Sequence, residues 1–285
     1  MLNVIGDGVE PPAFLPLLGQ HGEPQRLGLR AFEFAFAGEP EHVLAAARSI
    51  APWADVNVLP AANRRKKLLV ADMDSTIIRC ECLDELADMA GIQPKIAAIT
   101  ERAMRGEIAF EPALRQRVAL LKGLPIDALE RTYKERVLLN AGAQTLVATM
   151  RVGGAHTVLV SGGFTFFTAR VSKAAGFHEH HANTLLHDGE QLVGTVDEPI
   201  LGREAKLQAL EDAVAAHKLS FDDALAVGDG ANDLDMINRA GLGVAYHAKP
   251  IVVDAARASI AHSDLTALLF LQGYLESEFV SPRPA

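Results

Sequence analysis

Short polar stretches follow three apolar runs of the sequence, and their residue types suit phosphate chemistry. "LLVA" (68–71) leads into "DMDST", "TVLV" (157–160) into "SGG", and "ALAV" (224–227) into "GDGAND". Such apolar runs are typical of buried strands in a parallel sheet, where a bare carboxylate is costly. The groups in these stretches that could do chemistry are Asp72, Asp74, Ser161, Gly162, Asp229, Asn232 and Asp233.

Together the three stretches offer a cation site and an anion site. Asp72, Asp74 and Asp229 would repel one another without a cation, and carboxylates without histidine or thiol ligands suit Mg²⁺. Ser161 and the following glycine amides, at the start of an expected helix, make a donor-rich cup for a phosphate. Ligands bind at the carboxyl ends of the strands in an open parallel sheet. Three such ends at one edge therefore predict phosphoryl chemistry, although each alone also fits a turn, a glycine-rich loop or a metal-binding turn without catalysis.

The elements that must position these residues form an α/β pattern. From residue 68 apolar strands alternate with amphipathic helices, which predicts a parallel sheet. "GVAY" (243–246) is a fourth strand, and helices are expected over 203–217 and 231–241. Between about 80 and 140 the pattern is helical with no strong buried strand, which indicates an insert after the first strand.

The N-terminal part of the chain has a different pattern. It contains an alternating run over 30–38, then "PEHVLAAARSIA" as a short helix and "DVNVLP" as a strand. The basic stretch at 63–67 indicates an exposed junction. We therefore expect a small α+β segment over 1–64 and the main domain over 65–285.

Composition and charge exclude several classes of protein. The 285 residues carry a formal net charge of -9, which argues against a nucleic-acid partner. No stretch has the length of apolar sequence that a membrane span needs, and the N-terminus lacks the pattern of a signal peptide. The two cysteines, Cys80 and Cys82, are too close for a comfortable disulfide. We expect reduced thiols in a cytoplasmic protein.

The polar stretches resemble those of a known enzyme superfamily. "DMDST", "VSGG", a lysine and "GDGAND" stand in the order found in the haloacid dehalogenase (HAD) superfamily of phosphotransferases, over about 66–275. The resemblance is closest to the branch that hydrolyses O-phospho-L-serine to L-serine and phosphate, the last step of L-serine biosynthesis. It implies a HAD-like Rossmannoid parallel sheet with helices on both faces, and a helical cap over about 80–140.

The resemblance implies roles for the two aspartates of "DMD". Asp72 would be the nucleophile that forms an aspartyl-phosphate. Asp74 would protonate the leaving oxygen and then activate the hydrolytic water. Asp72, the backbone carbonyl of Asp74 and Asp229 would hold Mg²⁺. Members of the superfamily whose phosphoenzyme must persist carry threonine at the second position, so Asp74 favours a phosphatase.

The same resemblance assigns the phosphate-binding residues. Ser161, the Gly162 amide and Lys206 would bind and neutralise the transferring phosphoryl group. Asn232 and Asp233 would support the metal and the lysine. Without the resemblance, Lys206 is simply a lysine on an amphipathic helix, which is usually solvated.

The same resemblance assigns substrate recognition to the cap. Glu81 would meet the substrate ammonium, and Arg117 would bind its carboxylate through a planar guanidinium. Phe110 and Met104 match apolar positions that would shield the site from water. An alternative is a related small phosphate such as phosphohomoserine, and a non-enzymatic alternative is an amino-acid-binding regulator with a vestigial domain. The presence of all four of Asp72, Asp74, Lys206 and Asp229 argues against the second.

Two further stretches are interpreted as outside the site. The histidines of "GFHEHHANT" do not fit an all-oxygen metal site and are expected to be incidental surface residues. Some members of the same branch carry an amino-terminal ACT-like regulatory domain, of which residues 1–64 show about half the βαββαβ pattern. A sheet extension or a contact in a homodimer fits this segment as well as amino-acid sensing does.

Overall fold

A six-stranded parallel sheet forms the centre of the protein. The computed structural model describes residues 1–18, 23–36 and 38–281, with Met104 described in its backbone only. The strand order is β12-β11-β10-β5-β6-β7. The strands are β5 (Leu68–Asp72), β6 (His156–Phe164), β7 (Glu179–Asn183), β10 (Ala224–Gly228), β11 (Leu242–Tyr246) and β12 (Ala258–Ile260). The three strands predicted to carry the site, β10, β5 and β6, are therefore neighbours.

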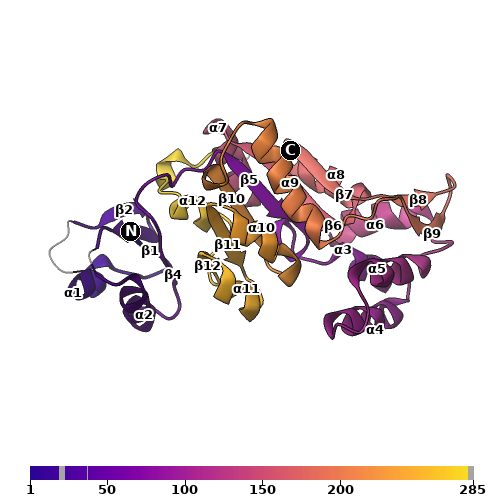
Figure 1. The fold of residues 1–285 in the computed structure, drawn as a ribbon, viewed down its shortest axis with the longest axis horizontal. Coiled ribbons are helices and arrows are strands. Elements are labelled where there is room, and N and C mark those ends of the chain that lie inside the picture. Colours follow the sequence, from indigo (N-terminus) through magenta and orange to yellow (C-terminus); the bar gives the residue numbers. More distant parts are fainter. Residues whose placement is uncertain (19–22, 37, 282–285) are drawn as a thin grey trace.

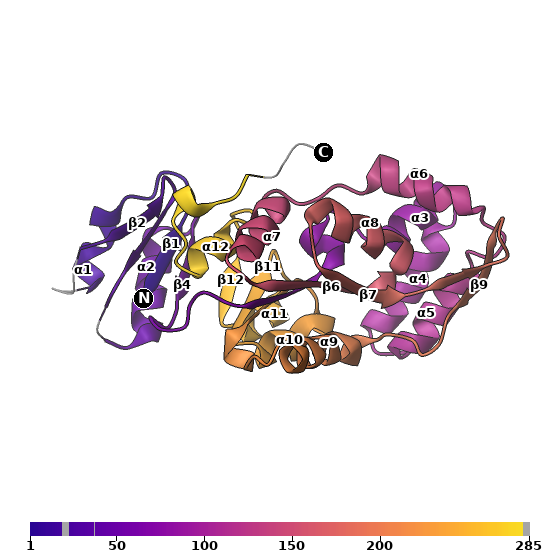
Figure 2. The same cartoon turned by 90° about the horizontal axis from the view of Figure 1, so that it is seen from above.

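Helices cover both faces of this sheet (Figure 2). One face carries α7 (Ala143–Val152), α8 (Thr165–Ala175) and α12 (Ala267–Leu271), and the other carries α9 (Arg203–Ala216), α10 (Leu234–Arg239) and α11 (Pro250–Ala255). Short 3-10 turns lie at η3 (Phe221–Asp223), η4 (Ala231–Asp233) and η5 (Glu276–Glu278).

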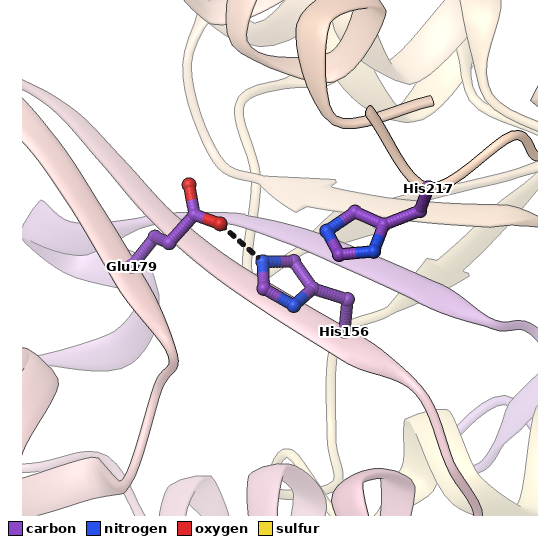
Figure 3. A group of neighbouring side chains, drawn as sticks. All are labelled: His156, Glu179 and His217. Carbon is purple, nitrogen blue, oxygen red and sulfur yellow. Dashed lines mark hydrogen bonds and ion pairs between the residues drawn. The ribbon is translucent and has the colours of Figure 1, made fainter. Parts of the chain in front are cut away.

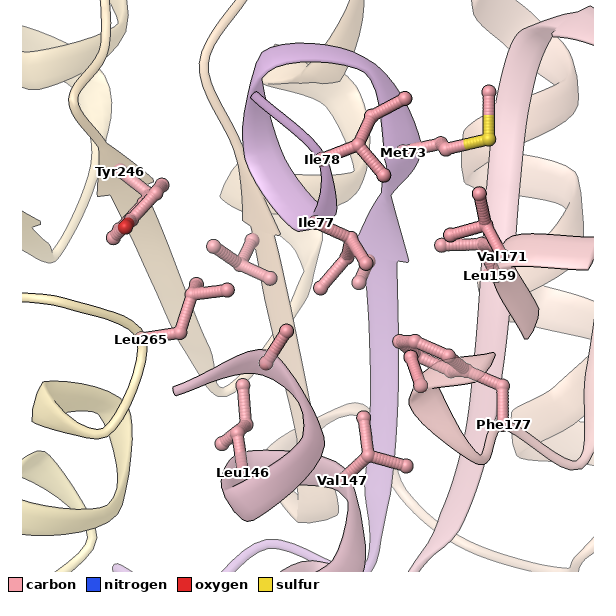
Figure 4. Packing of buried hydrophobic residues seen from close by; sticks show 14 of the residues in the cluster. Met73, Ile77, Ile78, Leu146, Val147, Leu159, Val171, Phe177, Tyr246 and Leu265 are labelled. Carbon is pink, nitrogen blue, oxygen red and sulfur yellow. The ribbon is translucent and has the colours of Figure 1, made fainter. Parts of the chain in front are cut away.

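Burial on both faces explains why β5 reads as a continuous apolar run. Leu69 and Ala71 pack into the core under α7 and α8, whereas Leu68 and Val70 pack into the core under α9 and α10. Figure 4 shows the first of these cores, where side chains from the turn after β5 meet those of β6 and α7. The predicted fold class, a parallel sheet between two helical layers, is confirmed.

Four helices follow the first strand of the sheet, as the sequence predicts. The turn Met73–Ile77 (η2) leads into α3 (Cys82–Met89), α4 (Gln93–Met104), α5 (Phe110–Ala119) and α6 (Ile126–Arg136). The hairpin of β8 (Leu185–His187) and β9 (Leu192–Val196) packs against this insert, and the amide of Gly123 donates to the Leu192 carbonyl over 2.8 Å. In Figure 1 the insert and this hairpin lie at one end of the molecule and the N-terminal segment at the other.

The N-terminal segment is a four-stranded antiparallel sheet with the order β2-β3-β1-β4. Along the chain it runs β1 (Leu2–Ile5), η1 (Pro11–Phe14) with α1 (Leu15–Leu18), β2 (Gln25–Gly28), β3 (Ala31–Phe34), α2 (Pro40–Ile50) and β4 (Asp55–Val58). This is the complete βαββαβ order, of which the sequence showed only about half. β2 escaped prediction because only Leu27 is buried in it, so no alternating pattern appears.

Side-chain hydrogen bonds join the N-terminal sheet to the main domain. Asn57 exchanges two hydrogen bonds with the backbone of Ser259, at 3.0 and 2.9 Å. The Asp55 carboxylate accepts from the amides of Ala261 and Ser263, and Arg64 pairs with Glu33 while donating to the main domain. The contacts of Asn57 and Asp55 fasten β4 to the end of β12, and Arg64 joins β3 to the end of α12. No helix in the described part of the chain combines the length and apolarity that crossing a membrane requires.

Candidate active site

The first two predicted site residues lie on a sharp turn at the end of β5. Asp72 is the last residue of that strand, and Asp74 already has extended rather than helical backbone angles. Ser75 follows with φ of 56°, in the left-handed region. Its hydroxyl donates to Glu81 Oε1 over 2.7 Å, and its amide donates to the Cys80 carbonyl. The turn thus brings the start of the helical insert next to the strand end.

Asp72 belongs to a buried triad with one cation and two acids. Lys206 Nζ donates to Asp72 Oδ1 and to Asp233 Oδ1, both at 2.6 Å. Lys206 lies in the first turn of α9, and its residue exposure is only 2%. Asp233 is fully buried, and its second oxygen accepts from the Gly230 amide. Burial opposes the charge on Lys206, but the two carboxylates outweigh it and raise the lysine pKa.

Negative charge is in excess around this triad. Burial, and then the charge of Asp233, raises the pKa of Asp72 well above its usual range, although Lys206 acts in the opposite direction. Burial and Asp233 also raise the pKa of Asp229. Asp72, Asp229 and Asp233 each offer a carboxylate oxygen within 4.8 Å of the others. Three oxygen donors and an uncompensated charge suit a divalent metal ion.

Asp74 has a different environment from Asp72. Its Oδ1 accepts from the Cys82 amide and its Oδ2 from the Ser161 hydroxyl, both at 2.9 Å. Burial raises the pKa of Asp74, and these two hydrogen bonds oppose the rise. Its side chain is therefore bound to β6 and α3. The acidic group, which we define as Asp72, Asp229 and Asp233, contains Asp233 and not the Asp74 carboxylate. The metal contact expected from Asp74 is its backbone carbonyl, and that expectation stays a prediction.

The Ser161-Gly162-Gly163 stretch is held at the edge of the site by parallel pairing. Asp72 is in register with Val160, so Ser161 comes next to the end of β5. The Gly163 amide donates to Ser161 Oγ over 2.8 Å. A methyl group on Gly163 would lie 3.0 Å from Ser161 Oγ and 3.2 Å from Asp74 Oδ2. The backbone can approach the carboxylate this closely only with glycine.

Asn183 is a residue of the site that sequence reasoning missed. Its side chain is buried, and Nδ2 donates to the carbonyls of Gly162 (2.9 Å) and Leu201 (3.1 Å). Its Oδ1 accepts from the Leu201 amide over 2.8 Å. Asn183 therefore joins the glycine stretch to the loop before α9. The available signal was its position as a polar residue at the carboxyl end of β7, within the stretch noted only for its histidines.

The predicted substrate-recognition residues Glu81 and Arg117 lie in the helical insert, near the acids of the strand ends. Glu81 is exposed at the surface, but desolvation on its inner side raises its pKa to about 7, with the charges of Asp74 and Asp229 acting in the same direction. Burial lowers the pKa of Arg117 on α5, against the charges of Asp84 and Glu81.

Phe110 lies against the glycine stretch of the site. A methyl group on either Gly162 or Gly202 would lie 3.3 Å from the Phe110 ring, so this ring covers the glycine stretch. Asn232 is exposed in η4, and the side chain of Met104 lies outside the described residues. Cys80 and Cys82 are free thiols, as expected.

Known proteins share both the sequence and the fold. The sequence model of the haloacid dehalogenase-like hydrolases matches residues 69–238. A phosphoserine phosphatase from Polaromonas sp. is 46% identical over 210 residues, which cover 72% of this chain and 89% of that protein. The phosphoserine phosphatase of Archaeoglobus fulgidus is 43% identical over 206 residues, 72% of this chain, which spans 60% of that protein. The structure of a probable phosphoserine phosphatase from Vibrio cholerae gives a TM-score of 0.80 at 30% identity, over 97% of this chain and 87% of that one.

The family match spans the strand ends, the triad and the helical insert described above. The family match alone covers more than half of the 285 residues. The chain belongs to the haloacid dehalogenase-like hydrolase family, and its relatives there are phosphoserine phosphatases.

Proposed function

We propose that this protein hydrolyses O-phospho-L-serine to L-serine and phosphate, with Asp72 as the nucleophile and Asp74 as the acid and base. The observation that carries the proposal is the difference between the two aspartates. Asp72 contacts a buried ammonium, whereas Asp74 binds the Ser161 hydroxyl and a backbone amide. A carboxyl with a raised pKa, as Asp74 has, is suited to hold the proton that a leaving alkoxide needs.

The proposed reaction has two displacements at phosphorus. First, a carboxylate oxygen of Asp72 forms a bond to phosphorus while the bond to the serine oxygen breaks, and Asp74 gives its proton to that oxygen. Then Asp74, now a carboxylate, takes a proton from a water molecule. The water oxygen bonds to phosphorus, and the bond to Asp72 breaks, which releases phosphate and regenerates both acids.

The phosphoryl group gathers negative charge that the chain must balance. Lys206 supplies a fixed positive charge beside Asp72, and Asp233 holds that ammonium in place. The Ser161 hydroxyl and the Gly162 amide would bind the phosphoryl oxygens. Asp72, Asp229 and the Asp74 carbonyl would hold Mg²⁺, which when bound neutralises further charge on the transferring group.

Recognition of the amino acid is assigned to the helical insert. Glu81 would bind the substrate ammonium, Arg117 its carboxylate, and Phe110 and Met104 would exclude water. The position of these two residues supports this, because Glu81 accepts from the Ser75 hydroxyl beside Asp74, and Arg117 is half-buried with Asp84 and Glu81 as its charged neighbours. Asn232 would assist at the rim of the phosphate cup.

The direct test is phosphate and L-serine release from O-phospho-L-serine by the full chain. We expect release with Mg²⁺, none with EDTA, and recovery when Mg²⁺ is restored in excess. O-phospho-L-threonine and O-phospho-L-homoserine should give lower kcat/KM. If phosphohomoserine is the better substrate, or if no release depends on Mg²⁺, the proposal is wrong.

Truncated substrates separate the roles of Glu81 and Arg117. O-phosphoethanolamine lacks the carboxylate, so Arg117→Lys should lower kcat/KM for O-phospho-L-serine but hardly affect this compound. 3-Phosphooxypropanoate lacks the ammonium, so Glu81→Gln should lower kcat/KM for O-phospho-L-serine but hardly affect kcat/KM for this compound. Equal losses on the full and truncated substrates would remove these two residues from substrate recognition.

We also propose that residues 1–64 and 65–285 are separate structural units. The hydrogen bonds of Asn57 to β12 and of Asp55 to the residues after β12 support the first as an extension packed on the second. A homodimer through the N-terminal segment stays a prediction. The molar mass of the full chain measured by light scattering tests it.

A further inference from the structure

Two histidines and a glutamate from distant parts of the chain meet at the edge of the sheet opposite the phosphate site (Figure 3). His156 is the first residue of β6, Glu179 is the first residue of β7, and His217 directly follows α9. Each offers one ligand atom within 4.8 Å of the others. Ser161 lies five residues further along β6, roughly 16 Å away at strand spacing. The group is therefore separate from the candidate active site.

The contacts within the group already direct its polar atoms toward one another. His156 Nε2 lies 2.6 Å from Glu179 Oε1. Figure 3 marks this contact with a dashed line. The ring centroids of His156 and His217 are 3.9 Å apart, and their planes are tilted by 31°. His181 Nε2 lies 3.6 Å from the other oxygen of Glu179. The carboxylate is thus flanked by imidazoles on both of its oxygens.

The strands hold His156 in place. Its ring also stacks on that of His178, with centroids 4.7 Å apart and planes 12° apart. His178 is itself fixed, because its Nδ1 accepts from the amide of Thr157 over 3.2 Å. His156 is the most sheltered member of the group, with 17% of its side chain exposed, whereas Glu179 and His217 are exposed. His156 is therefore held in place by its neighbours, while Glu179 and His217 are accessible to solvent.

We propose that His156, Glu179 and His217 bind a divalent transition-metal ion of the Zn²⁺ type. Two imidazoles and one carboxylate form a common donor set for Zn²⁺, with water in the remaining position. Mg²⁺ prefers oxygen ligands, so this group and the acidic group around Asp72 select different ions. Binding replaces the imidazole stacking and the His156–Glu179 hydrogen bond with metal–ligand bonds, which requires the His217 ring to rotate.

The location gives the bound ion a structural consequence. It would tie the end of α9 to the beginnings of β6 and β7. Lys206 lies near the start of the same helix, and Ser161 near the end of β6. An ion that binds only the folded chain raises its stability by mass action. We therefore expect Zn²⁺ to raise the melting temperature without being needed for phosphate release.

The test is a Zn²⁺ titration of the full chain by calorimetry, with excess Mg²⁺ present to compete at the acidic group. We expect one Zn²⁺ per chain and a higher melting temperature. His156→Ala and His217→Ala should each weaken binding tenfold or more, and Glu179→Gln should weaken it less. His187→Ala, a change of an exposed histidine on β8, is the matched control and should bind like the unchanged chain. If His156→Ala and His217→Ala also bind like it, or if no saturable binding occurs, the proposal is wrong.

Substitution of Co²⁺ distinguishes this site from the two thiols. Nitrogen and oxygen ligands give weak visible bands, whereas Cys80 or Cys82 would add an intense near-ultraviolet thiolate band. We expect visible bands that disappear in His217→Ala and no thiolate band. A thiolate band, or bands unchanged in His217→Ala, would place the ion elsewhere and overturn the proposal. Phosphate release by His217→Ala with Mg²⁺ should match that of the unchanged chain, so this test stands apart from the proposed function.

Discussion

The ammonium of Lys206 lies 2.6 Å from a carboxylate oxygen of Asp72, and both residues are almost completely buried. Asp233 stands at the same distance from the same nitrogen. One cation therefore faces two acids, and all three side chains are shielded from solvent. Because of this imbalance, we expect removal of the cation to lower the stability of the fold and removal of one acid not to lower it.

Lys206→Met should strongly destabilise the fold. It leaves Asp72 and Asp233 buried without a positive partner, and breaking a buried ion pair costs about 3–5 kcal/mol. Urea unfolding in metal-free buffer measures this cost. Lys173→Met, a change of an exposed lysine on α8, is the control and should cost far less. Equal midpoints for the two variants would show that the triad does not depend on the lysine.

Asp72→Asn should abolish phosphate release without destabilising the metal-free fold. Burial and Asp233 raise the pKa of Asp72 above its unfolded value. The folded state therefore loses stability as pH rises from the unfolded to the folded pKa of Asp72, because the unfolded chain ionises this carboxyl more easily. A neutral amide removes this penalty at pH 7, while loss of the nucleophile should lower kcat by roughly 10³-fold or more.

Melting curves in EDTA and phosphate-release assays in Mg²⁺ measure the two effects of Asp72→Asn. Asp254→Asn alters an exposed acid on α11 and should leave both unchanged. A clear drop in the melting temperature of Asp72→Asn would contradict the expected excess of negative charge. Undiminished phosphate release would exclude Asp72 as the nucleophile.

Asn183→Ala should lower kcat more than it changes KM. The side chain fixes the Gly162 peptide and the loop before α9, and a small displacement of groups at a reacting centre can cost about 10²-fold. Asn183→Asp should be no better, because a carboxylate cannot donate to the two carbonyls that Nδ2 serves. Thr184→Ala changes the exposed next residue and is the control. Rescue by Asn183→Asp would show that the donor bonds have no positioning role.

The kcat/KM for O-phospho-L-serine should fall as pH drops through about 7. Desolvation and the nearby charge of Asp74 raise the pKa of Glu81 to about 7, so its carboxylate is charged above that pH and loses its attraction for the ammonium below it. The substrate phosphate titrates at about pH 6 and adds its own effect. Comparison with Glu81→Gln isolates the contribution of Glu81. Identical pH profiles for the two proteins would exclude this carboxyl from ammonium binding.

The local pattern of the sequence was enough to predict the parallel sheet and the edge of it that carries the polar site residues. Apolar runs that end in Asp72, Ser161 and Asp229 show both the strands and their polar ends within a few residues. Because the carboxyl ends of parallel strands share one edge, the convergence of these residues follows from the fold class. The family resemblance added Lys206, which helix periodicity alone does not distinguish from a solvated lysine.

The sequence by itself thus determined the fold class, the strand-end acids and the membership of a hydrolase family. Only the tertiary structure decided which side chains meet across the sheet. It placed Asp233 rather than the Asp74 carboxylate among the acids, and it brought His156 and His217 to Glu179. Strand and helix patterns arise from neighbouring residues, whereas these contacts depend on the register of strands and on a helix packed between distant segments. No local pattern carries that information.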